Sequence, residues 1–257
     1  MSRGLSRKDA AERYERERRQ GAEIAASGLE RVWGWSSPAG KIRAARRAAF
    51  LAEAAGLRPG VRCLEIGAGT GEFTARLLDT GSVLTALELS DATGEICRAR
   101  VNGRAEIVIG NIETGEGLAG RTFDAVVGVS ILHHVNLDLT LATIARVLEP
   151  GGRFAFSEPN MANPQVWAER AIRLVGRLRH TTEHETAFRP RQLREAFERH
   201  GFVVDESRSF DFVHPATPRV ALPAVIRLGE MLERTPVREI AGSVLIAGSA
   251  PALAKAS

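Results

Sequence analysis

The sequence predicts an α/β fold built around one mostly parallel, doubly wound sheet. Between Val61 and Asn160, short apolar runs typical of strands alternate with stretches of about 10–15 residues that have helical periodicity. The first apolar run, VRCLEIGAG, leads into a glycine loop and then into a predicted helix. This order of elements predicts successive βαβ units with right-handed crossovers.

The expected elements can be placed along the chain. Residues 1–20 are polar with a helical composition, which indicates a surface helix or a frayed terminus. A helix is expected to begin at Ser37-Pro38, because proline suits a first helical turn, and to stop at Gly56. Strands are expected within 61–69, 82–90, 105–113, 121–135, 153–160, 202–210 and 241–251, and further helices within 71–81, 91–101, 137–152 and 189–201.

Two stretches, 161–188 and 211–236, break this rhythm and are interpreted as helical insertions. We therefore expect an N-terminal helical segment over 1–56, followed by one domain over 57–257 that carries both insertions. The length of 257 residues suits a single domain with additions.

The bulk composition is that of a globular chain, with 44% hydrophobic and 26% charged residues. The sequence has no apolar run of about 18 residues, so no membrane span is predicted. The charged N-terminus is not followed by the apolar stretch of a secretory signal, so none is predicted. The two cysteines have no metal-binding spacing, so a reduced, cytoplasmic setting is predicted. The net charge of +4 raises the question of nucleic acid, but interleaved charges such as AERYERERR favour solvated helix faces.

The glycine loop LEIGAGTGEF suggests a ligand that approaches the backbone closely. Gly67, Gly69 and Gly71 are two residues apart, and Glu72 stands where a dinucleotide-binding loop would have its third glycine. Glu65 lies at the mouth of the loop. Its carboxylate would repel a pyrophosphate and attract an ammonium group.

Residues at two later strand ends indicate further parts of this ligand. Glu88 ends the second strand about 20 residues after the glycines, where an acidic side chain can accept hydrogen bonds from ribose hydroxyls. Asn111 ends the third strand and can hydrogen-bond to a ring such as adenine. The pattern predicts a nucleoside with a positively charged amino-acid tail.

With these residues in place, the sequence resembles the class I S-adenosylmethionine-dependent methyltransferases. The matching segments are LEIGAGTGEF, ALELS, GNIE, FDAVVGVSILHHV and ARVLEPGGRF, in the family's order over roughly 61–160. Asn111 departs from the aspartate that the family commonly has there. The resemblance implies a Rossmann-like sheet of seven strands with the last strand antiparallel, a helical cap, and S-adenosylmethionine as cofactor with S-adenosylhomocysteine as product.

The resemblance also implies roles for individual residues. Glu65 and the loop backbone would hold the methionine portion, and Glu88 the ribose. The cofactor-binding residues implied in this way are Glu65, Gly67, Ala68, Gly69, Gly71, Glu88, Leu89, Asn111, Ile112 and Ser130. In this family the N-terminal segment commonly folds over the cofactor, so Trp33 or Trp35 is expected to contact it, with plain packing as the alternative.

Three side chains at neighbouring strand ends are candidates for catalysis. His133 and His134 follow the fourth strand, and Glu158 ends the fifth. A histidine there could accept a hydroxyl proton near neutral pH, and Glu158 could orient the imidazole or bind substrate hydroxyls. The trio resembles that of natural-product sugar O-methyltransferases. The alternative is that one histidine only packs.

The predicted acceptor is a small molecule. Neither an Asn/Asp-Pro-Pro-aromatic motif nor a Pro-Cys nucleophile appears, which argues against methylation of nucleic-acid bases. We expect O-methylation of a sugar, polyketide or lipid-like metabolite. A small-molecule N-methyltransferase, an RNA methyltransferase and a noncatalytic cofactor-binding protein remain alternatives.

The insertions are expected to shape the acceptor pocket. Residues 165–179 form a basic amphipathic helix with Trp167 on its apolar face, which suggests a lid, core packing or peripheral membrane contact. His180 and His184 have a spacing that could bind a metal if helical, but no metal is predicted, and His184 with Glu185 is expected to line the substrate mouth or cap a helix. The second insertion could form an oligomer contact.

Overall fold

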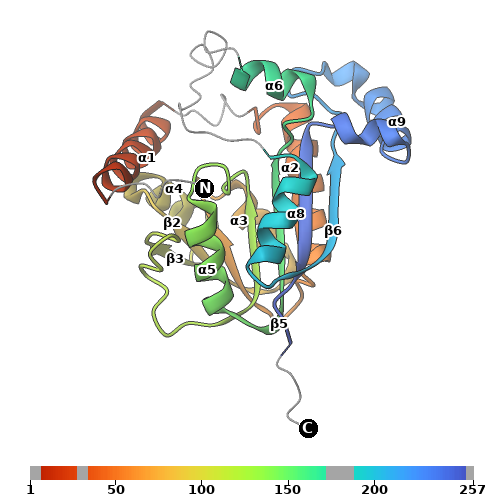
Figure 1. Cartoon of the computed structure of the whole chain (residues 1–257). Helices are drawn as coiled ribbons and strands as arrows, with labels where there is room; N and C mark the ends of the chain where they lie inside the picture. The colour runs from red at the N-terminus through yellow and green to blue at the C-terminus, as the bar shows by residue number, and fades with distance from the viewer. Residues whose placement is uncertain (1–6, 28–33, 172–187, 253–257) are drawn as a thin grey trace.

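The computed structural model describes residues 7–27, 34–171 and 188–252, and it contains the predicted sheet (Figure 1). The seven strands lie in the order β3-β2-β1-β4-β5-β7-β6. Their bounds are β1 Arg62–Ile66, β2 Val83–Glu88, β3 Glu106–Ile109, β4 Phe123–Val129, β5 Leu148–Pro159, β6 Val203–Phe210 and β7 Ser243–Ser249. All the pairings are parallel except those of β7, which is antiparallel to β5 and β6. The predicted fold class, including the antiparallel last strand, is confirmed.

Helices cover both faces of this sheet because alternate strand residues are apolar on each face. On one face, α5 (Leu137–Val147) and α8 (Pro190–Arg199) pack with the inward side chains of β1, β4, β5 and β7. Phe197 of α8 stacks on Phe154 with ring centroids 4.6 Å apart, and both are fully buried. Burial of one such side chain contributes about 1.5–3 kcal/mol.

The other face is covered by α2 (Pro38–Ala54) and α3 (Glu72–Leu77), whose Leu51 and Leu77 join a second core cluster with residues of β1, β4, β5 and β7. The Ser37 hydroxyl accepts a hydrogen bond from the N–H of Gly40 and caps α2, as the Ser-Pro signal predicts. The helix α4 (Asp91–Val101) has the predicted bounds.

One boundary differs from the prediction. The helix expected over 137–152 ends at Val147, and β5 begins at Leu148, ahead of the Pro-Gly-Gly sequence. Leu148 pairs with Phe123 of β4, and the register then shifts before Arg153 pairs with Ala125. Sheet pairing therefore ends the helix before the proline could.

The polar N-terminal stretch forms the helix α1 (Arg7–Ser27), which packs against α4. Gly21 is buried at this contact. A Cβ atom there would lie 2.5 Å from the Cβ and Oγ of Ser90, just before α4. Glycine at this position lets α1 approach the sheet edge closely.

The insertions lie at the carboxyl ends of the parallel strands. α6 (Pro164–Ala171) follows β5 directly, while η3 (Arg219–Ala221), α9 (Leu222–Leu232) and η4 (Pro236–Ile240) follow β6; Figure 1 shows α6 and α9 at the same end of the molecule. Trp33, His180, His184, Glu185 and most of the expected helix over 165–179 fall outside the described residues. Across the parts that the structure describes, no helix is long and apolar enough to cross a membrane.

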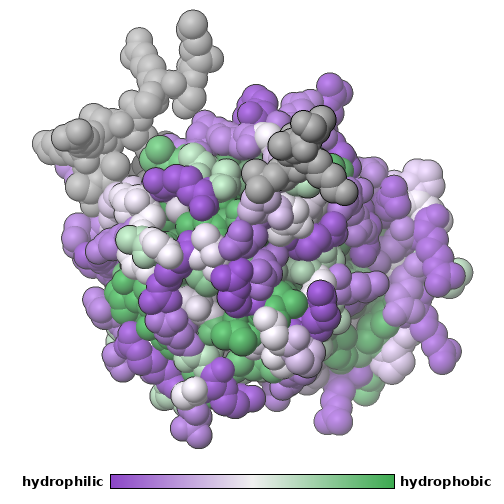
Figure 2. Space-filling view, turned by 90° about the horizontal axis from the view of Figure 1, so that it is seen from below, coloured by the Kyte–Doolittle hydropathy of each residue, from purple (hydrophilic) through white to green (hydrophobic). Residues whose placement is uncertain are grey.

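The opposite end of the sheet is seen in Figure 2. Its surface is a mosaic of hydrophilic side chains with smaller apolar areas. Val83 and Val203, which begin β2 and β6, are more than half exposed. The buried polar residues predicted to bind ligands, such as Glu65 and Asn111, lie instead at or just after the carboxyl ends of the strands.

Candidate functional site

The glycine loop joins β1 to α3. Its three glycines all have a positive φ, but they differ in how much space a side chain would have. Gly67, Gly69 and Gly71 have φ values of 73°, 53° and 83°, in the left-handed region that favours glycine. A Cβ on Gly67 would lie 2.7 Å from the side chain of Ile131, and one on Gly71 would lie 2.9 Å from the Sγ of Cys97. A Cβ on Gly69 would meet nothing within 4 Å. The loop therefore packs tightly at both ends and presents open space at Gly69.

Glu65, at the end of β1, is a buried acid with unused hydrogen-bonding capacity. Its side chain is 3% exposed, and its Oε2 has no hydrogen-bond partner among the described residues. Burial raises the pKa of Glu65 to about 8; the Thr74 hydroxyl, which hydrogen-bonds to it, lowers the pKa, and the charge of Glu88 raises it. A buried oxygen of this kind is costly unless a donor reaches it. The ammonium group of an amino-acid tail would supply that donor, so the site fits the expected cofactor.

Glu88, at the end of β2, has a structural role that the sequence did not reveal. Its carboxylate accepts hydrogen bonds from the N–H of Gly69 at 2.7 Å, the N–H of Ser90 at 3.0 Å and the hydroxyl of Thr93 at 2.9 Å. It thereby fixes the glycine loop to the next strand. An ionised carboxylate has about four acceptor sites, so capacity remains for a ribose hydroxyl. That assignment, and the adenine contact of Leu89, stay predictions.

The loop after β3 is organised by Asn111. This residue is buried, and its Oδ1 accepts the N–H of Glu113 at 2.9 Å. Ile112 belongs to the main core cluster, and Ala68, which follows Gly67, packs with α4. These contacts are all within the protein, so the predicted contacts of the three residues with the cofactor stay predictions.

At the end of β4 and β5, His133 and Glu158 form a buried pair. The Nδ1 of His133 lies 2.7 Å from Oε2 of Glu158. Oε1 of Glu158 accepts the N–H groups of Ile131 and Leu132, each at 2.9 Å. Burial raises the pKa of Glu158 to about 7, although those two N–H groups and the charge of His134 lower it. Glu158 therefore braces the whole loop that carries both histidines.

Ser130 and His134 lie in the same loop, between β4 and α5. Ser130 has φ of 53°, an unusual value for a residue that is not glycine, and its N–H donates to the Ser157 carbonyl at 2.7 Å. The His134 ring centroid lies 4.1 Å from that of His133, and its side chain is 24% exposed against 5% for His133. His134 is the more accessible histidine of the two.

Trp35 packs beside the start of α3. Its ring meets Phe73 edge to face at 5.3 Å, and the guanidinium groups of Arg43 and Arg47 each lie 5.3 Å from its centroid. These ring contacts show that Trp35 packs within the protein. They do not test whether Trp35 also contacts the cofactor, which stays a prediction.

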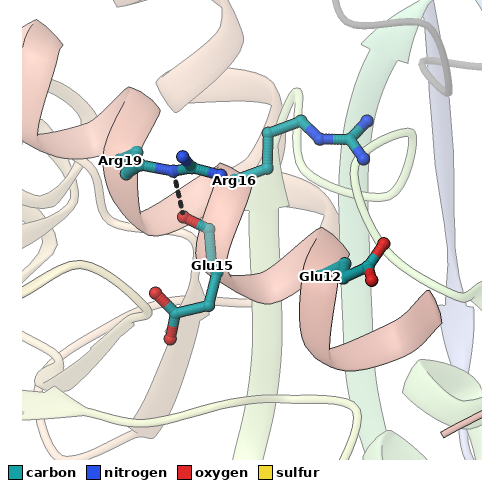
Figure 3. Close-up of a pocket in the computed structure, with 4 residues that line it drawn as sticks. All are labelled: Glu12, Glu15, Arg16 and Arg19. Carbon is teal, nitrogen blue, oxygen red and sulfur yellow. Dashed lines mark hydrogen bonds between the residues drawn. The ribbon is translucent and has the colours of Figure 1, made fainter. Parts of the chain in front are cut away.

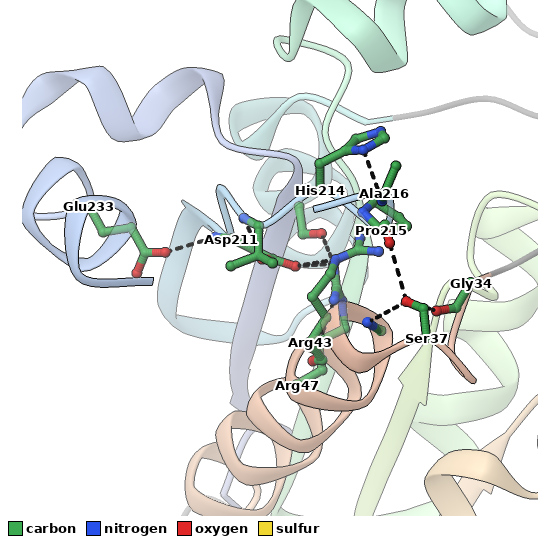
Figure 4. Close-up of polar contacts among 12 residues, drawn as sticks. Gly34, Ser37, Arg43, Arg47, Asp211, His214, Pro215, Ala216 and Glu233 are labelled. Atoms are coloured by element: carbon green, nitrogen blue, oxygen red, sulfur yellow. Dashed lines mark hydrogen bonds and ion pairs between the residues drawn. The ribbon is translucent and has the colours of Figure 1, made fainter. Parts of the chain in front are cut away.

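The same two arginines connect α2 to the second insertion, as Figure 4 shows. Arg47 and Arg43 pair with Asp211 at 2.8 and 3.0 Å, and the N–H of Asp211 donates to Glu233, which follows α9 directly. Burial lowers the pKa of Arg47 to about 10 although Asp211 raises it. This buried network holds the insertion in place beside the strand ends.

A separate surface hollow on α1 does not belong to this site. It is lined by Glu12, Glu15, Arg16 and Arg19, all from one stretch of the helix (Figure 3). Three of these side chains are exposed. None of the predicted site residues lines it. Within the described ranges, no three His, Cys, Asp or Glu side chains are grouped closely enough to hold a metal ion.

Sequence reasoning missed the contacts of α1 with the strand-end loops. The Tyr14 hydroxyl donates to Oε2 of Glu113 at 3.0 Å, and Oε1 of Glu113 accepts the N–H of Asn136 at 2.9 Å. Oε2 of Glu17 lies 3.6 Å from Nδ1 of His134. No sequence motif indicates the contacts of Tyr14 and Glu17, because each joins the polar N-terminal stretch to a residue about a hundred positions away.

Comparison with known proteins agrees with this geometry. The family described as "Methyltransferase domain" matches residues 64–156. The uncharacterized methyltransferase YrrT of Bacillus subtilis is 30% identical over 164 residues, which cover 61% of this chain and 76% of YrrT. The ubiquinone/menaquinone biosynthesis C-methyltransferase UbiE of Teredinibacter turnerae is 32% identical over 124 residues, which cover 43% of this chain and 49% of UbiE. The match thus spans about half the length of that quinone-pathway relative.

Two solved structures share the fold. One is the putative methyltransferase of Haloferax volcanii in its complex with the Trm112 activator, with a TM-score of 0.65, 22% identity and coverage of 90% of this chain and 97% of that one. The other is magnesium protoporphyrin IX methyltransferase of Synechocystis PCC 6803 with bound S-adenosylhomocysteine, with a TM-score of 0.63, 11% identity and coverage of 93% and 99%. At these identities the likeness concerns the fold.

Proposed function

Because the chain belongs to the class I S-adenosylmethionine-dependent methyltransferases, we propose that it transfers a methyl group to a hydroxyl of a small molecule, on a sugar, polyketide or lipid-like metabolite. The observation that carries the proposal is the pair of histidines at the end of β4. One of them, His133, is held by Glu158, and the other, His134, lies beside it with its ring tilted and its side chain 24% exposed. An alcohol needs a base at this position, whereas an amine does not.

The cofactor, when bound, supplies a methyl group on a cationic sulfur. The residues of this chain would then bind and orient it. Glu65 would pair with the ammonium of the amino-acid tail, the open backbone at Gly69 would border that tail, and Glu88 would face the ribose. Asn111 and Ile112 would border the adenine, and Ser130 the methionine end.

His134 is proposed as the general base. Its imidazole would take the proton of the acceptor hydroxyl as that oxygen becomes a nucleophile. His133 and Glu158 would keep the loop rigid, since an acid–base group must be held within hydrogen-bond reach of the proton it removes. Glu158 then acts through the loop rather than by touching the substrate.

The acceptor pocket would form between the cap and the strand ends. The cap consists of the segment 1–56 with the insertions 161–188 and 211–236, and the rest of 57–257 forms the cofactor domain. The buried contact of Arg47 with Asp211 supports this arrangement, because it fixes the second insertion to α2.

A second candidate is methylation of a ring carbon next to a hydroxyl. It is favoured by the matches to proteins named as C-methyltransferases of quinone biosynthesis, such as UbiE. The same base would serve, since removal of a phenolic proton makes the neighbouring ring carbon nucleophilic.

The test is an acceptor screen with methyl-labelled S-adenosylmethionine. The panel holds sugars, phenolic polyketides, prenylated phenols and small amines, and the readouts are S-adenosylhomocysteine formation and the NMR shift of the labelled methyl group. A methoxyl signal supports O-methylation, and an aryl-methyl signal supports the second candidate. Turnover confined to amines would refute both, and it would be unaffected by His134→Gln.

A further inference from the structure

The helix α1 lies against three strand-end loops of the site at once. Gly21 meets Ser90, which follows β2, so closely that an added Cβ would lie 2.5 Å from it. Tyr14 donates to Glu113 after β3, and Glu17 faces His134 after β4. Each of these loops carries a residue proposed to bind the cofactor or the acceptor. Figure 1 shows α1 beside α4, at the edge of the sheet.

Glu17 and His134 are close enough for the carboxylate to interact electrostatically with the imidazole. Oε2 of Glu17 lies 3.6 Å from Nδ1 of His134, and the two side chains are 21% and 24% exposed. Partial burial strengthens such a pair relative to one in bulk water. Two other titratable groups lie beside His134: His133, whose ring is tilted by 39° with its centroid 4.1 Å away, and Glu158, whose pKa is lowered by the charge of His134.

Both carboxylate oxygens of Glu158 already have hydrogen-bond partners other than His134. Its two oxygens hold the N–H groups of Ile131 and Leu132 and the ring of His133. Glu17 places a carboxylate 3.6 Å from Nδ1 of His134, an ion-pair distance, whereas Glu158 lies at hydrogen-bond distance, 2.7 Å, from Nδ1 of His133. A carboxylate at one ring nitrogen orients an imidazole and favours its protonated form.

Tyr14 and Glu113 set the register of α1 over this loop. Tyr14 and Glu17 are three residues apart, so they share one face of the helix. Glu113 is buried and joins Tyr14 to the N–H of Asn136, two residues after His134. A shift of α1 by one turn would break both contacts together.

We propose that Glu17 is a positioning residue for His134, and that the contacts of Tyr14 with Glu113 and of Gly21 with Ser90 bring it there, so that docking of α1 completes the base. The proposal rests on the proposed function in one respect, the role of His134 as base. When the acceptor hydroxyl loses its proton to His134, the carboxylate of Glu17 faces the positive charge formed on the ring.

The test measures the ionisation of His134 directly. The full chain is labelled at histidine, saturated with S-adenosylhomocysteine and titrated by NMR. Glu17→Gln is expected to lower the titration midpoint of His134 by about half a pH unit, since an exposed or half-exposed pair contributes about 0.2–1 kcal/mol and 1.36 kcal/mol corresponds to one unit. Glu15→Gln, at an exposed position of α1, is the matched control and should leave the His134 midpoint unchanged.

A second variant covers the case in which Glu17→Gln displaces the helix. Gly21→Ala forces α1 away from Ser90 while leaving Glu17 intact, and hydrogen exchange of α1 reports the displacement. The proposal expects the His134 midpoint to fall in this variant also. It is overturned if Glu17→Gln leaves the His134 midpoint unchanged, or if Gly21→Ala releases α1 without moving it.

These measurements separate the proposal from the proposed function. The NMR midpoint does not depend on turnover, so a failure of His134 as base would appear in the acceptor assay and not here. Once a substrate is known, Glu17→Gln should lower kcat and leave the KM for S-adenosylmethionine nearly unchanged. It should also move the acid limb of the pH profile of kcat to lower pH. Glu17→Asp should restore part of both effects; equal losses in Glu17→Asp and Glu17→Gln would contradict a role in charge and orientation.

Discussion

Glu158 and His133 lie 2.7 Å apart inside the protein, and the same carboxylate holds the backbone of Ile131 and Leu132. The pair braces the loop that also carries His134. The two neighbouring histidines differ in their surroundings: the side chain of His133 is 5% exposed and that of His134 is 24% exposed.

The first prediction separates these two histidines. His134→Gln should lower turnover by about 10²–10⁴-fold, the range for loss of a general base, with cofactor affinity unchanged within about twofold. His133→Gln should mainly lower the free energy of unfolding, by about 1–3 kcal/mol, because it removes the imidazole from Oε2 of the buried Glu158. Urea unfolding, calorimetry and the acceptor assay measure these quantities. Full turnover in both variants would remove the proposed base.

The second prediction concerns the proton on Glu65. With a pKa of about 8, Glu65 is mostly protonated at pH 6.5 and must ionise to pair with an ammonium group. Binding of S-adenosylhomocysteine should therefore release up to one proton at pH 6.5, and its affinity should rise by up to tenfold per unit between pH 6 and 7.5. Calorimetry in two buffers with different ionisation heats counts the protons. Glu65→Gln should bind more weakly and release none; proton release equal to the wild type would exclude Glu65 as the source.

The third prediction concerns the stability of the free protein. The pKa of Glu65 is raised from 4.5 to about 8 on folding, so its contribution to stability is complete below pH 4.5 and is lost as pH rises through 8. Glu65→Gln removes this loss. Relative to the wild type, the variant should gain up to a few kcal/mol between pH 5 and pH 9 in urea unfolding, an upper limit set by the roughly 1.36 kcal/mol per pKa unit. A constant difference across that range would contradict the assignment.

The fourth prediction tests Glu88. Glu88→Ala removes both the expected ribose acceptor and the anchor of the Gly69 N–H, so S-adenosylhomocysteine affinity should fall by at least about 100-fold, or about 2.7 kcal/mol. Thr93→Val is the control, since it deletes one internal donor to Glu88 without touching the proposed ligand position. Calorimetry should show a change of less than about threefold for the control. Unchanged affinity in Glu88→Ala would withdraw the ribose assignment.

The fifth prediction concerns the buried network between α2 and the second insertion. Asp211→Asn leaves Arg47 and Arg43 without their anion, and breaking a buried pair of this kind costs about 3–5 kcal/mol. The pKa of Asp211 is held below its usual value against the effect of burial by these arginines, so its contribution exists above pH 3.8 and is lost as pH falls. Asp124→Asn, at an exposed pair with Arg62, should cost less than about 1 kcal/mol. Equal losses of unfolding free energy in the two variants would contradict this account.

The sheet was predictable because its signals are local. The strands could be placed from apolar runs, the start of α2 from Ser37-Pro38, and the ligand loop from three glycines, the residue that adopts positive φ values most readily. The start of β5 could not be placed, since pairing of Leu148 with Phe123 decides it and nothing local does.

The site was predictable only in part, for a related reason. Motifs marked Glu65 and Glu88 as acids near a ligand, but the three protein donors that Glu88 accepts come from loops brought together by folding. The position of α1 was not predictable at all. Its contacts depend on Gly21 and Tyr14, single residues in a polar helix with no apolar stripe to indicate what it covers.

The placement of α1 has a practical consequence for handling the protein. A purification tag or fluorescent reporter fused ahead of Arg7 would be attached to the helix whose Glu17 and Gly21 contact His134 and Ser90. β7 runs antiparallel to its neighbours and delivers the chain after Ser249 to the other end of the sheet, as Figure 1 shows. Carboxyl-terminal fusions should therefore preserve ligand affinity where amino-terminal ones perturb it.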